Sequence, residues 1–175
     1  MDLSPDFVPS EPIPVVRLNP ETREREFVHL HWGLIPAWVS GPSLGSRLTH
    51  ARAETVATKR AFREVFRRRR CLVVMDSFHL SRRGKPYLIQ MQDGQPFGVG
   101  AIWDGWQGDD ENYIESCAVI TTAANEVVQP INDRMPVIIA PEDYDRWLDQ
   151  EFYDAEELER MMQPWPSDRM LVSPG

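Results

Sequence analysis

Basic side chains recur at helical spacing in residues 56–70, which read VATKRAFREVFRRRR. Positions three and four residues apart lie on one face of a helix, and the valine and phenylalanine residues between them form an apolar side that can anchor in a core. A row of cations on an anchored helix is suited to track the phosphates of a nucleic-acid backbone. The alternative is a solvated basic helix that balances acidic residues elsewhere. The row consists of Lys59, Arg63, Arg67 and Arg70.

The net charge of −8 does not exclude a nucleic-acid partner, because the charges are unevenly distributed. Residues 1–100 hold 15 basic and 10 acidic residues, whereas residues 101–175 hold 4 and 17. Between Arg47 and Lys85, 12 basic residues meet only 3 acidic ones. Local fields rather than totals steer a polyanion, so this central part of the chain is the candidate for a nucleic-acid contact.

A second charged group precedes an aliphatic run in residues 131–139, which read INDRMPVII. A buried strand does not require Asp133 and Arg134 at its beginning, so the pair indicates a role beyond packing. A guanidinium fork matches the oxygens of a phosphate group. The neighbouring Asn132 carries an amide, which does not ionise and cannot serve as an acid or a base.

The histidines do not indicate a metal centre. His29 and His31 would share one face of a strand predicted at residues 25–32, but a metal ion needs further ligands. The only other histidines are His50 and His79. We therefore expect no metal ion and no cofactor.

Length and composition are those of a single globular domain over residues 1–175, with 42% hydrophobic and 26% charged residues. No apolar stretch approaches the roughly 20 residues that span a bilayer, and the N-terminal segment lacks the basic and apolar regions of a secretion signal. Cys71 and Cys117 fall in apolar strand-like segments, so we expect reduced core thiols. The expected location is the cytoplasm, without membrane contact.

Short strand-like segments separated by Pro and Gly make up most of the remaining chain. The Asp-Gly step at residues 93–94 favours a β-hairpin between the strands on either side of it. The expected fold class is α+β, a single domain with a curved, mainly antiparallel, barrel-like sheet flanked by short helices. Strands are predicted at 12–18, 25–32, 71–78, 86–92, 96–106, 116–122 and 135–139, and helices at 56–70, 123–130, 141–149 and 154–162.

Five segments resemble, in order and spacing, the SRAP family (SOS-response-associated peptidases, the abasic-site processing proteins). The resemblance extends from about Pro9 to Leu148 and is carried by WGLIPAW, HARAETVATKRAFRE, RRCLVVMDSF, VITTAANEVVQPINDRMPVII and YDRWLD. It implies a DNA-damage-response activity on single-stranded DNA, in which a cysteine after the initiator methionine crosslinks to the aldehyde of an abasic site. It also implies a peptidase step in which the protein removes its own initiator methionine.

Carried over residue by residue, the resemblance predicts that this chemistry is lost. Residues 5–17 match the family segment that comes after an opening strand and helix, so that opening and its cysteine are expected to be missing. The family's asparagine before ARAET is His50, its glutamate position is Leu80, and its histidine before DRMP is Asn132. Leucine cannot transfer a proton, so crosslinking and self-processing are expected to fail.

The positions that would hold DNA are retained. Arg52 and Arg134 match family positions near the bound backbone, and Glu54 and Asp133 would orient them; the alternative is plain salt bridges at loop ends. Together with three residues of the basic row, these positions give the expected DNA-binding set Trp32, Pro36, Arg52, Glu54, Lys59, Arg63, Arg67, Thr121 and Arg134.

Two parts of this set have a structural alternative. Trp32 and Pro36, in a loop predicted at residues 32–46, resemble an apolar lip on which bases stack. Core packing is the alternative for Trp32, and it applies more strongly to Trp38. Thr121 and Thr122 either donate to a phosphate or help to cap a helix predicted directly after them.

The favoured hypothesis is a SRAP-like protein that binds single-stranded or abasic-site DNA without crosslinking to it. A start site upstream, supplying the missing cysteine, is a second reading, against which the internal changes at Leu80 and Asn132 argue. A third is altered chemistry, with His50 as a base for a terminal amine. A fourth is a protein-interaction module whose acidic C-terminal third binds a basic partner.

The missing opening segment has a structural consequence. It would leave a sheet edge or an apolar groove exposed, and such edges invite pairing. A homodimer, or residues 5–12 folding back over the gap, would cover it.

Overall fold

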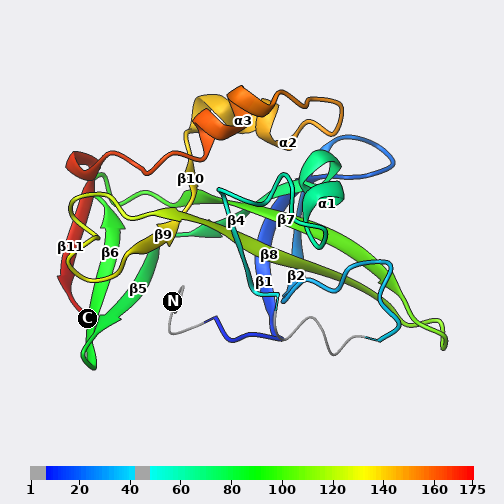
Figure 1. Cartoon of the computed structure of the whole chain (residues 1–175), viewed down its shortest axis with the longest axis horizontal. Coiled ribbons are helices and arrows are strands. Elements are labelled where there is room, and N and C mark those ends of the chain that lie inside the picture. Colours follow the sequence, from blue (N-terminus) through cyan, green and yellow to red (C-terminus); the bar gives the residue numbers. More distant parts are fainter. Residues whose placement is uncertain (1–6, 42–47) are drawn as a thin grey trace.

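Five strands pair in a ring and close a barrel (Figure 1). The computed structural model describes residues 7–41 and 48–175. Strand β1 pairs with β2 and β4, β4 with β7, and β7 with β8, all antiparallel, and a parallel β2–β8 contact completes the ring. The α+β class with a barrel-like sheet is thereby confirmed. The barrel strands are β1 (Pro12–Leu18), β2 (Arg25–Trp32), β4 (Arg70–Met75), β7 (Phe97–Gln107) and β8 (Tyr113–Ala123).

Three short strands extend the barrel at the end of β8. Strand β3 (His50–Arg52) runs parallel to β8 beyond the point where β2 leaves it, and β9 (Arg134–Pro136) pairs with β8 on the opposite side. Strand β10 (Ile138–Ile139) pairs with β7. The single strand predicted at 135–139 is therefore split at Val137, whose backbone instead bonds to Ile120 and Gly100.

A second sheet of three strands lies at one end of the barrel (Figure 1). It contains β5 (Ser77–Arg82), β6 (Lys85–Met91) and β11 (Met170–Pro174), so the strand predicted at 71–78 is in fact two strands in different sheets. Arg83 and Gly84 form the turn between β5 and β6, both with positive φ, as a two-residue hairpin requires.

The hairpin predicted at the Asp-Gly step of residues 93–94 is wrong. Strand β6 before it pairs with β5 and β11, whereas β7 after it pairs with β4, β8 and β10. Gly94 does adopt a positive φ of 67°, so the turn chemistry is as expected. The turn passes the chain from one sheet to the other, which local sequence does not distinguish from a hairpin.

The basic helix predicted at 56–70 is much shorter. Helix α1 comprises Arg63–Arg68, and residues 53–58 and 60–62 form successive turns. Thr55, Val56 and Thr58 are β-branched residues with low helix propensity, and the Thr58 hydroxyl bonds back to the Thr55 carbonyl at 3.3 Å. Residues 126–131 likewise form turns in place of the helix predicted at 123–130.

The two acidic helices near the C-terminus are confirmed and cover one side of the barrel (Figure 1). A 3₁₀ turn, Pro141–Asp143, leads into α2 (Tyr144–Leu148), and Asp154 caps α3 (Ala155–Met161) by accepting from the Glu157 amide. None of the helices in the described part of the chain is long and apolar enough to cross a membrane.

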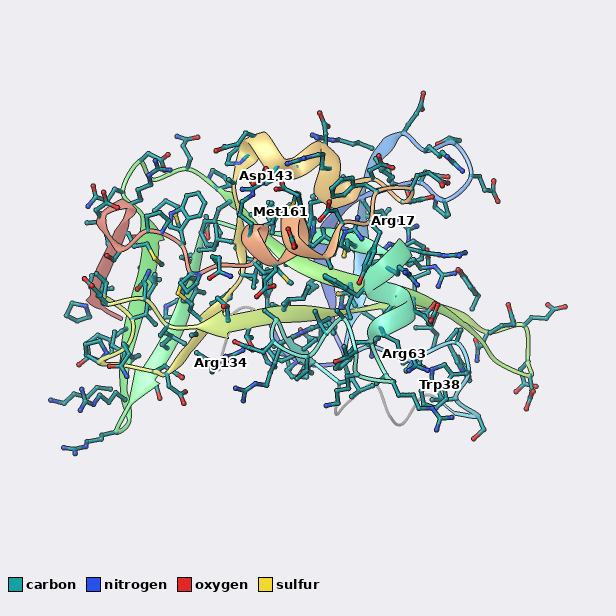
Figure 2. The ribbon with its side chains drawn as sticks, turned by 45° about the horizontal axis from the view of Figure 1, so that its top comes forward. Arg17, Trp38, Arg63, Arg134, Asp143 and Met161 are labelled. Atoms are coloured by element: carbon teal, nitrogen blue, oxygen red, sulfur yellow. The ribbon has the colours of Figure 1, made fainter. Side chains whose placement is uncertain are left out.

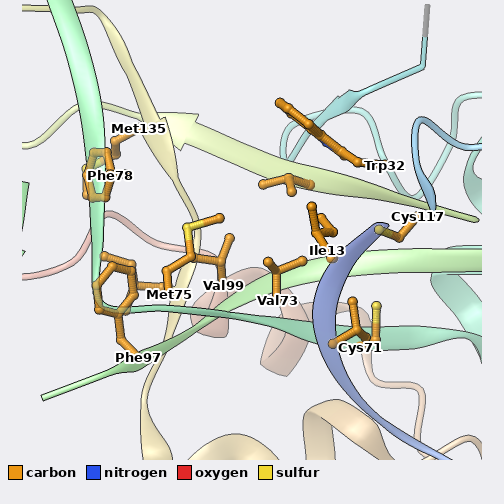
Figure 3. Close-up of a cluster of buried hydrophobic side chains, with 14 of the residues drawn as sticks. Ile13, Trp32, Cys71, Val73, Met75, Phe78, Phe97, Val99, Cys117 and Met135 are labelled. Carbon is orange, nitrogen blue, oxygen red and sulfur yellow. The ribbon is translucent and has the colours of Figure 1, made fainter. Parts of the chain in front are cut away.

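Two apolar clusters form the core. One fills the barrel and the space beneath the small sheet (Figure 3), and the other lies between the barrel and the helices. Cys71 and Cys117 are buried and not disulfide-bonded, as predicted, and burial raises the pKa of both thiols. Both cysteines belong to the first cluster, so neither is an exposed nucleophile.

The described part of the segment before β1, residues 7–11, folds back along the barrel. Phe7 packs against the first cluster, and the backbone of Ser10 and Glu11 bonds to that of Trp32. The first two residues of the predicted 5–12 segment lie outside the described part, as do residues 42–46 of the predicted loop.

Candidate nucleic-acid interface

The guanidinium of Arg134 makes a two-pronged contact with the carboxylate of Glu54. Nη1 donates to Oε1 at 2.8 Å and Nη2 donates to Oε2 at 2.9 Å. Nη2 also donates to the carbonyl and hydroxyl oxygens of Thr121, at 2.9 and 3.1 Å. Such pairs fix both the position and the direction of a guanidinium. The fork of Arg134 is therefore occupied, and a phosphate would have to displace Glu54 to reach it.

Strand pairing brings these residues together from three separate segments. Thr121 of β8 pairs with Arg52 of β3 on one side and with Pro136 of β9 on the other. Arg134 is the first residue of β9, and Glu54 lies two residues beyond the end of β3. The site thus depends on β8 extending beyond the closed barrel, where it gathers β3 and β9.

Arg52 is the available cation of this group. Its side chain is 66% exposed, and its Nε lies 3.8 Å from Oε2 of Glu54, a loose contact. Hydrogen bonding to Arg134 is the main cause that lowers the pKa of Glu54, so the carboxylate remains charged between the two arginines. This is the geometry of a carboxylate that orients both guanidinium groups.

Asp133 does not share that orienting role in the structure. Its side chain is exposed and makes no ion pair with any residue that the structure describes. Asn132 has a positioning function instead: its Oδ1 accepts from the backbone N–H of Arg134 at 3.1 Å. This local bond starts β9 at Arg134, so the amide of Asn132 shapes the turn that places the guanidinium.

Leu80 and His50, the other two substituted positions, are both packed. Leu80 is 1% exposed and belongs to the barrel cluster. The His50 ring meets the Trp32 ring edge-on at 5.5 Å, and its Nδ1 lies 3.0 Å from the Thr49 hydroxyl. Within residues 7–41 and 48–175, no three His, Cys, Asp or Glu side chains gather in a way that could hold a metal ion.

Trp32 and Pro36 do not form an exposed lip. Trp32 is 2% exposed and donates its indole N–H to the Thr49 carbonyl at 3.0 Å, and Pro36 is buried as well. Core packing, the alternative reading, describes both residues. Trp38 was expected to pack in the core, but its side chain is exposed, at 60%.

The loop that carries Trp38 is hydrogen-bonded to the barrel. Asp104, Trp106 and Ser116, from β7 and β8, each hydrogen-bond to its backbone at 2.8 to 2.9 Å. The guanidinium of Arg60 lies 5.5 Å from the Trp38 ring, and Figure 2 shows Trp38 beside α1. An exposed indole with an adjacent cation is suited to stacking a base, and sequence reasoning missed both residues.

The basic residues of the 59–70 segment divide into two groups. Lys59, Arg63 and Arg67 are exposed, as expected of a surface that tracks a nucleic-acid backbone, and Figure 2 shows Arg63 on α1. Arg70, the fourth residue of the predicted row, is buried at 3% exposure. The prediction that Arg70 continues the exposed row is wrong. The helix ends at Arg68 and β4 begins at Arg70, which turns the Arg70 side chain inward.

Thr121 and Thr122 are both buried, and the helix they were expected to cap does not form. The Thr121 hydroxyl is an acceptor for Arg134, so it supports the Arg134–Glu54 pair instead of facing a ligand directly. The structure thus brings Arg52, Glu54, Thr121 and Arg134 together, and it places exposed cations on the adjoining segment, residues 59–68.

Comparison with protein families matches residues 2–174 to the SOS response associated peptidase (SRAP) family. The abasic site processing protein YoqW of Bacillus subtilis is 34% identical over 146 residues, covering 81% of this chain and 65% of that protein. YedK of Escherichia coli, another abasic site processing protein, is 32% identical over 169 residues, covering 87% and 73%. The match thus spans about two thirds of the length of the Bacillus relative.

Solved structures share the fold. A protein from Bacteroides thetaiotaomicron superimposes with a TM-score of 0.83 at 27% identity, covering 94% of this chain and 74% of that one. A protein from Bordetella bronchiseptica gives a TM-score of 0.82 at 22% identity, covering 100% and 89%, and at that identity the likeness concerns the fold alone.

Proposed function

Because the chain belongs to the SOS response associated peptidase (SRAP) family, we propose that it acts in the DNA damage response by binding single-stranded DNA, with or without an abasic site. Relatives in bacteria and vertebrates are named abasic site processing proteins. In this proposal the protein recognises the strand and does not perform the covalent crosslinking or the self-processing that the family resemblance implies.

The proposal that the protein binds DNA rests on one observation: the segment that starts at Arg52 has an excess of exposed cations. Residues 52–69 contain seven basic and two acidic residues, and one of the two acidic residues, Glu54, is already held by Arg134. Lys59, Arg63 and Arg67 are exposed and form no ion pair with any described residue. Uncompensated cations of this kind can neutralise phosphates and release the counterions bound to them.

Support for the loss of chemistry comes from positions inside the chain. Leu80 is enclosed in the core and offers no proton, and Asn132 offers an amide that is already bonded to the Arg134 backbone. Of the three matched positions, His50 alone carries an ionisable group. One imidazole can act as a general base, but imine formation also needs a general acid beside the reacting aldehyde.

The test is a binding titration of a fluorescent single strand of about 20 nucleotides, with and without one abasic site, at about 50 and 200 mM salt. For single strands the affinity falls with a logarithmic slope of about 0.7 per phosphate contact, so four contacts lose about 50-fold over this range. A denaturing gel of the same mixtures should show no shifted protein band. A band that survives denaturation would contradict the loss of chemistry.

A matched pair of double variants locates the binding surface. Arg52→Gln with Arg63→Gln removes two exposed cations from the proposed surface. Arg83→Gln with Lys85→Gln removes two from the β5–β6 turn, which lies at the end of the molecule away from α1 (Figure 1). The first pair should weaken binding about tenfold or more and lower the salt slope, whereas the second should leave both nearly unchanged. Equal losses would mean unspecific attraction, and no binding by the wild type would end the proposal.

A further inference from the structure

A groove of about 540 Å³ lies at the C-terminal end of α1. Its walls come from α1, from β7 and from the loop after α2. Arg67, Arg68 and Arg69 line it together with Trp103 and Tyr153. Three arginines and two aromatic residues therefore line one concave surface.

The charges in the groove are not balanced. Arg67 and Arg68 are exposed and form no ion pair with any residue in the described part of the chain. Arg69 is held by the buried carboxylate of Asp104 at 3.1 Å. Two carboxylates also line the groove, but one of them, Glu151, is engaged by Arg23 at 2.9 Å. An anion entering the groove therefore meets the two arginines that no described carboxylate holds.

Tyr153 supplies a flat surface beside these cations. It is 37% exposed, and the guanidinium of Arg67 lies 4.7 Å from its ring centre. Phe66 meets the same ring edge-on at 6.4 Å and holds it from the core side. An aromatic ring paired with a guanidinium is the combination on which nucleic-acid bases stack.

A second groove, of about 400 Å³, shares Tyr153 with the first. Small and apolar side chains dominate its lining, which includes Ala57, Phe66 and Met162. Glu54, the partner of Arg134 and neighbour of Arg52, also lines it. Tyr153 thus lines both a cationic groove suited to phosphate and an apolar groove that is also lined by Glu54.

We propose that Tyr153 and the cationic groove form a nucleotide subsite, in which Arg67 and Arg68 bind a phosphate and the Tyr153 ring stacks a base. This inference rests on the proposed function, because a strand held at Arg52 would reach Tyr153 through the apolar groove. The same phosphate and base are present in a free deoxynucleotide, so the test must separate the two sources.

The strand is tested with oligothymidylates of about 5, 10 and 20 nucleotides. Tyr153→Ala should weaken binding of the longest strand by about 5- to 100-fold, the range expected for one stacked base, and Tyr153→Phe should restore it. Arg67→Gln with Arg68→Gln should lower the salt slope by about 0.7 to 1.4. The shortest strand, held at Arg52, Lys59 and Arg63, should be less sensitive to these changes. Circular dichroism of each variant excludes a folding defect.

Failure of the subsite differs from failure of the proposed function. If Arg52→Gln with Arg63→Gln weakens binding and the groove variants do not, the DNA-binding proposal stands and the subsite is overturned. If the wild type binds no strand, thymidine 5′-monophosphate is titrated while its phosphorus resonance is monitored. Binding that Tyr153→Ala abolishes would support a site for the free nucleotide, and the absence of binding would overturn the subsite for both sources.

Discussion

Arg70 and the pair Arg67–Arg68 belong to one run of four arginines, yet they occupy opposite environments. Arg70 is buried, and its guanidinium donates at 2.7 to 3.1 Å to five backbone carbonyls, three of them from the region of α2. Desolvation lowers the pKa of Arg70 to about 10. Arg67 and Arg68 face a groove and have no carboxylate partner among the described residues.

The difference teaches that a count of cations overstates a binding surface. Arg70 joins α1, β4 and the α2 region, so its charge is used in folding. Arg17 is a second example, since it is buried between Glu26 and Glu115 at 2.8 and 2.6 Å. What makes an arginine available to a ligand is exposure without a partner, and local sequence does not report either property.

The largest effect is expected at Arg70. Arg70→Ala leaves several buried carbonyls without donors, each at a cost of about 1–3 kcal/mol, so the free energy of unfolding should fall by roughly 3–5 kcal/mol. Urea denaturation monitored by circular dichroism measures the change. A loss below about 1 kcal/mol would mean that the carbonyls find water, and the contrast with Arg67 and Arg68 would disappear.

Substitution of Arg134 should cost less stability than substitution of Arg70 and more than substitution of an exposed, unpaired arginine. Arg134→Ala removes bonds to a half-exposed carboxylate and to Thr121, so the expected loss of stability is about 1–2 kcal/mol. Its effect on strand affinity should be smaller than that of Arg52→Gln, because the Arg134 fork is occupied. Parallel denaturation and binding titrations check both parts, and a larger loss of affinity at Arg134 would show that phosphate displaces Glu54.

The stabilisation that Glu54 provides through its pair with Arg134 should depend on pH. The pKa of Glu54 is lowered in the folded protein, so the stabilisation from its pair with Arg134 is complete above the ordinary glutamate pKa of about 4.3. It is lost as the pH falls through the lowered folded pKa. The difference in melting temperature between wild type and Glu54→Gln should therefore be present near pH ~6 and shrink as the pH falls below the ordinary glutamate pKa of about 4.3. A difference independent of pH would assign it to packing.

The smallest effect on stability is expected at Arg68. The side chain is exposed and has no ion-pair partner in the described part of the chain, so Arg68→Ala should change the free energy of unfolding by less than about 0.5 kcal/mol. The same denaturation series as for Arg70 provides the measurement. A substantial loss would mean that Arg68 has a structural role and is not reserved for a ligand.

The sequence predicted the elements with clear periodicity and failed where tertiary contacts decide. Strands β1 and β2 have the predicted bounds: buried and more exposed positions alternate along β1, and apolar residues alternate with histidines in the second half of β2. The Asp-Gly turn was predicted correctly as a turn, but the pairing of its flanking strands depends on distant segments. The pair Trp32 and Trp38 shows the same limit: composition does not reveal which indole enters the core.

The candidate site was predictable in part for a related reason. Arg52, Glu54 and Arg134 were identified through the family resemblance, and the structure brings them together at the end of β8. Tyr153 was not identified, because its exposure and its contact with Arg67 arise from the fold of the loop after α2 over α1. No local pattern around Tyr153 distinguishes it from any tyrosine in an acidic loop.

The parallel contact that closes the barrel has a consequence for its motions. It consists of two residue pairs, His31 with Ser116 and Trp32 with Cys117, whereas β7 and β8 share seven. Short ladders open locally at a much lower free energy than the whole domain unfolds. The amide of Gly33, bonded to the Cys117 carbonyl, should therefore exchange its hydrogen early, while those in the β7–β8 ladder exchange through global unfolding. The barrel would open locally at the β2–β8 pairing, next to β3, which carries Arg52.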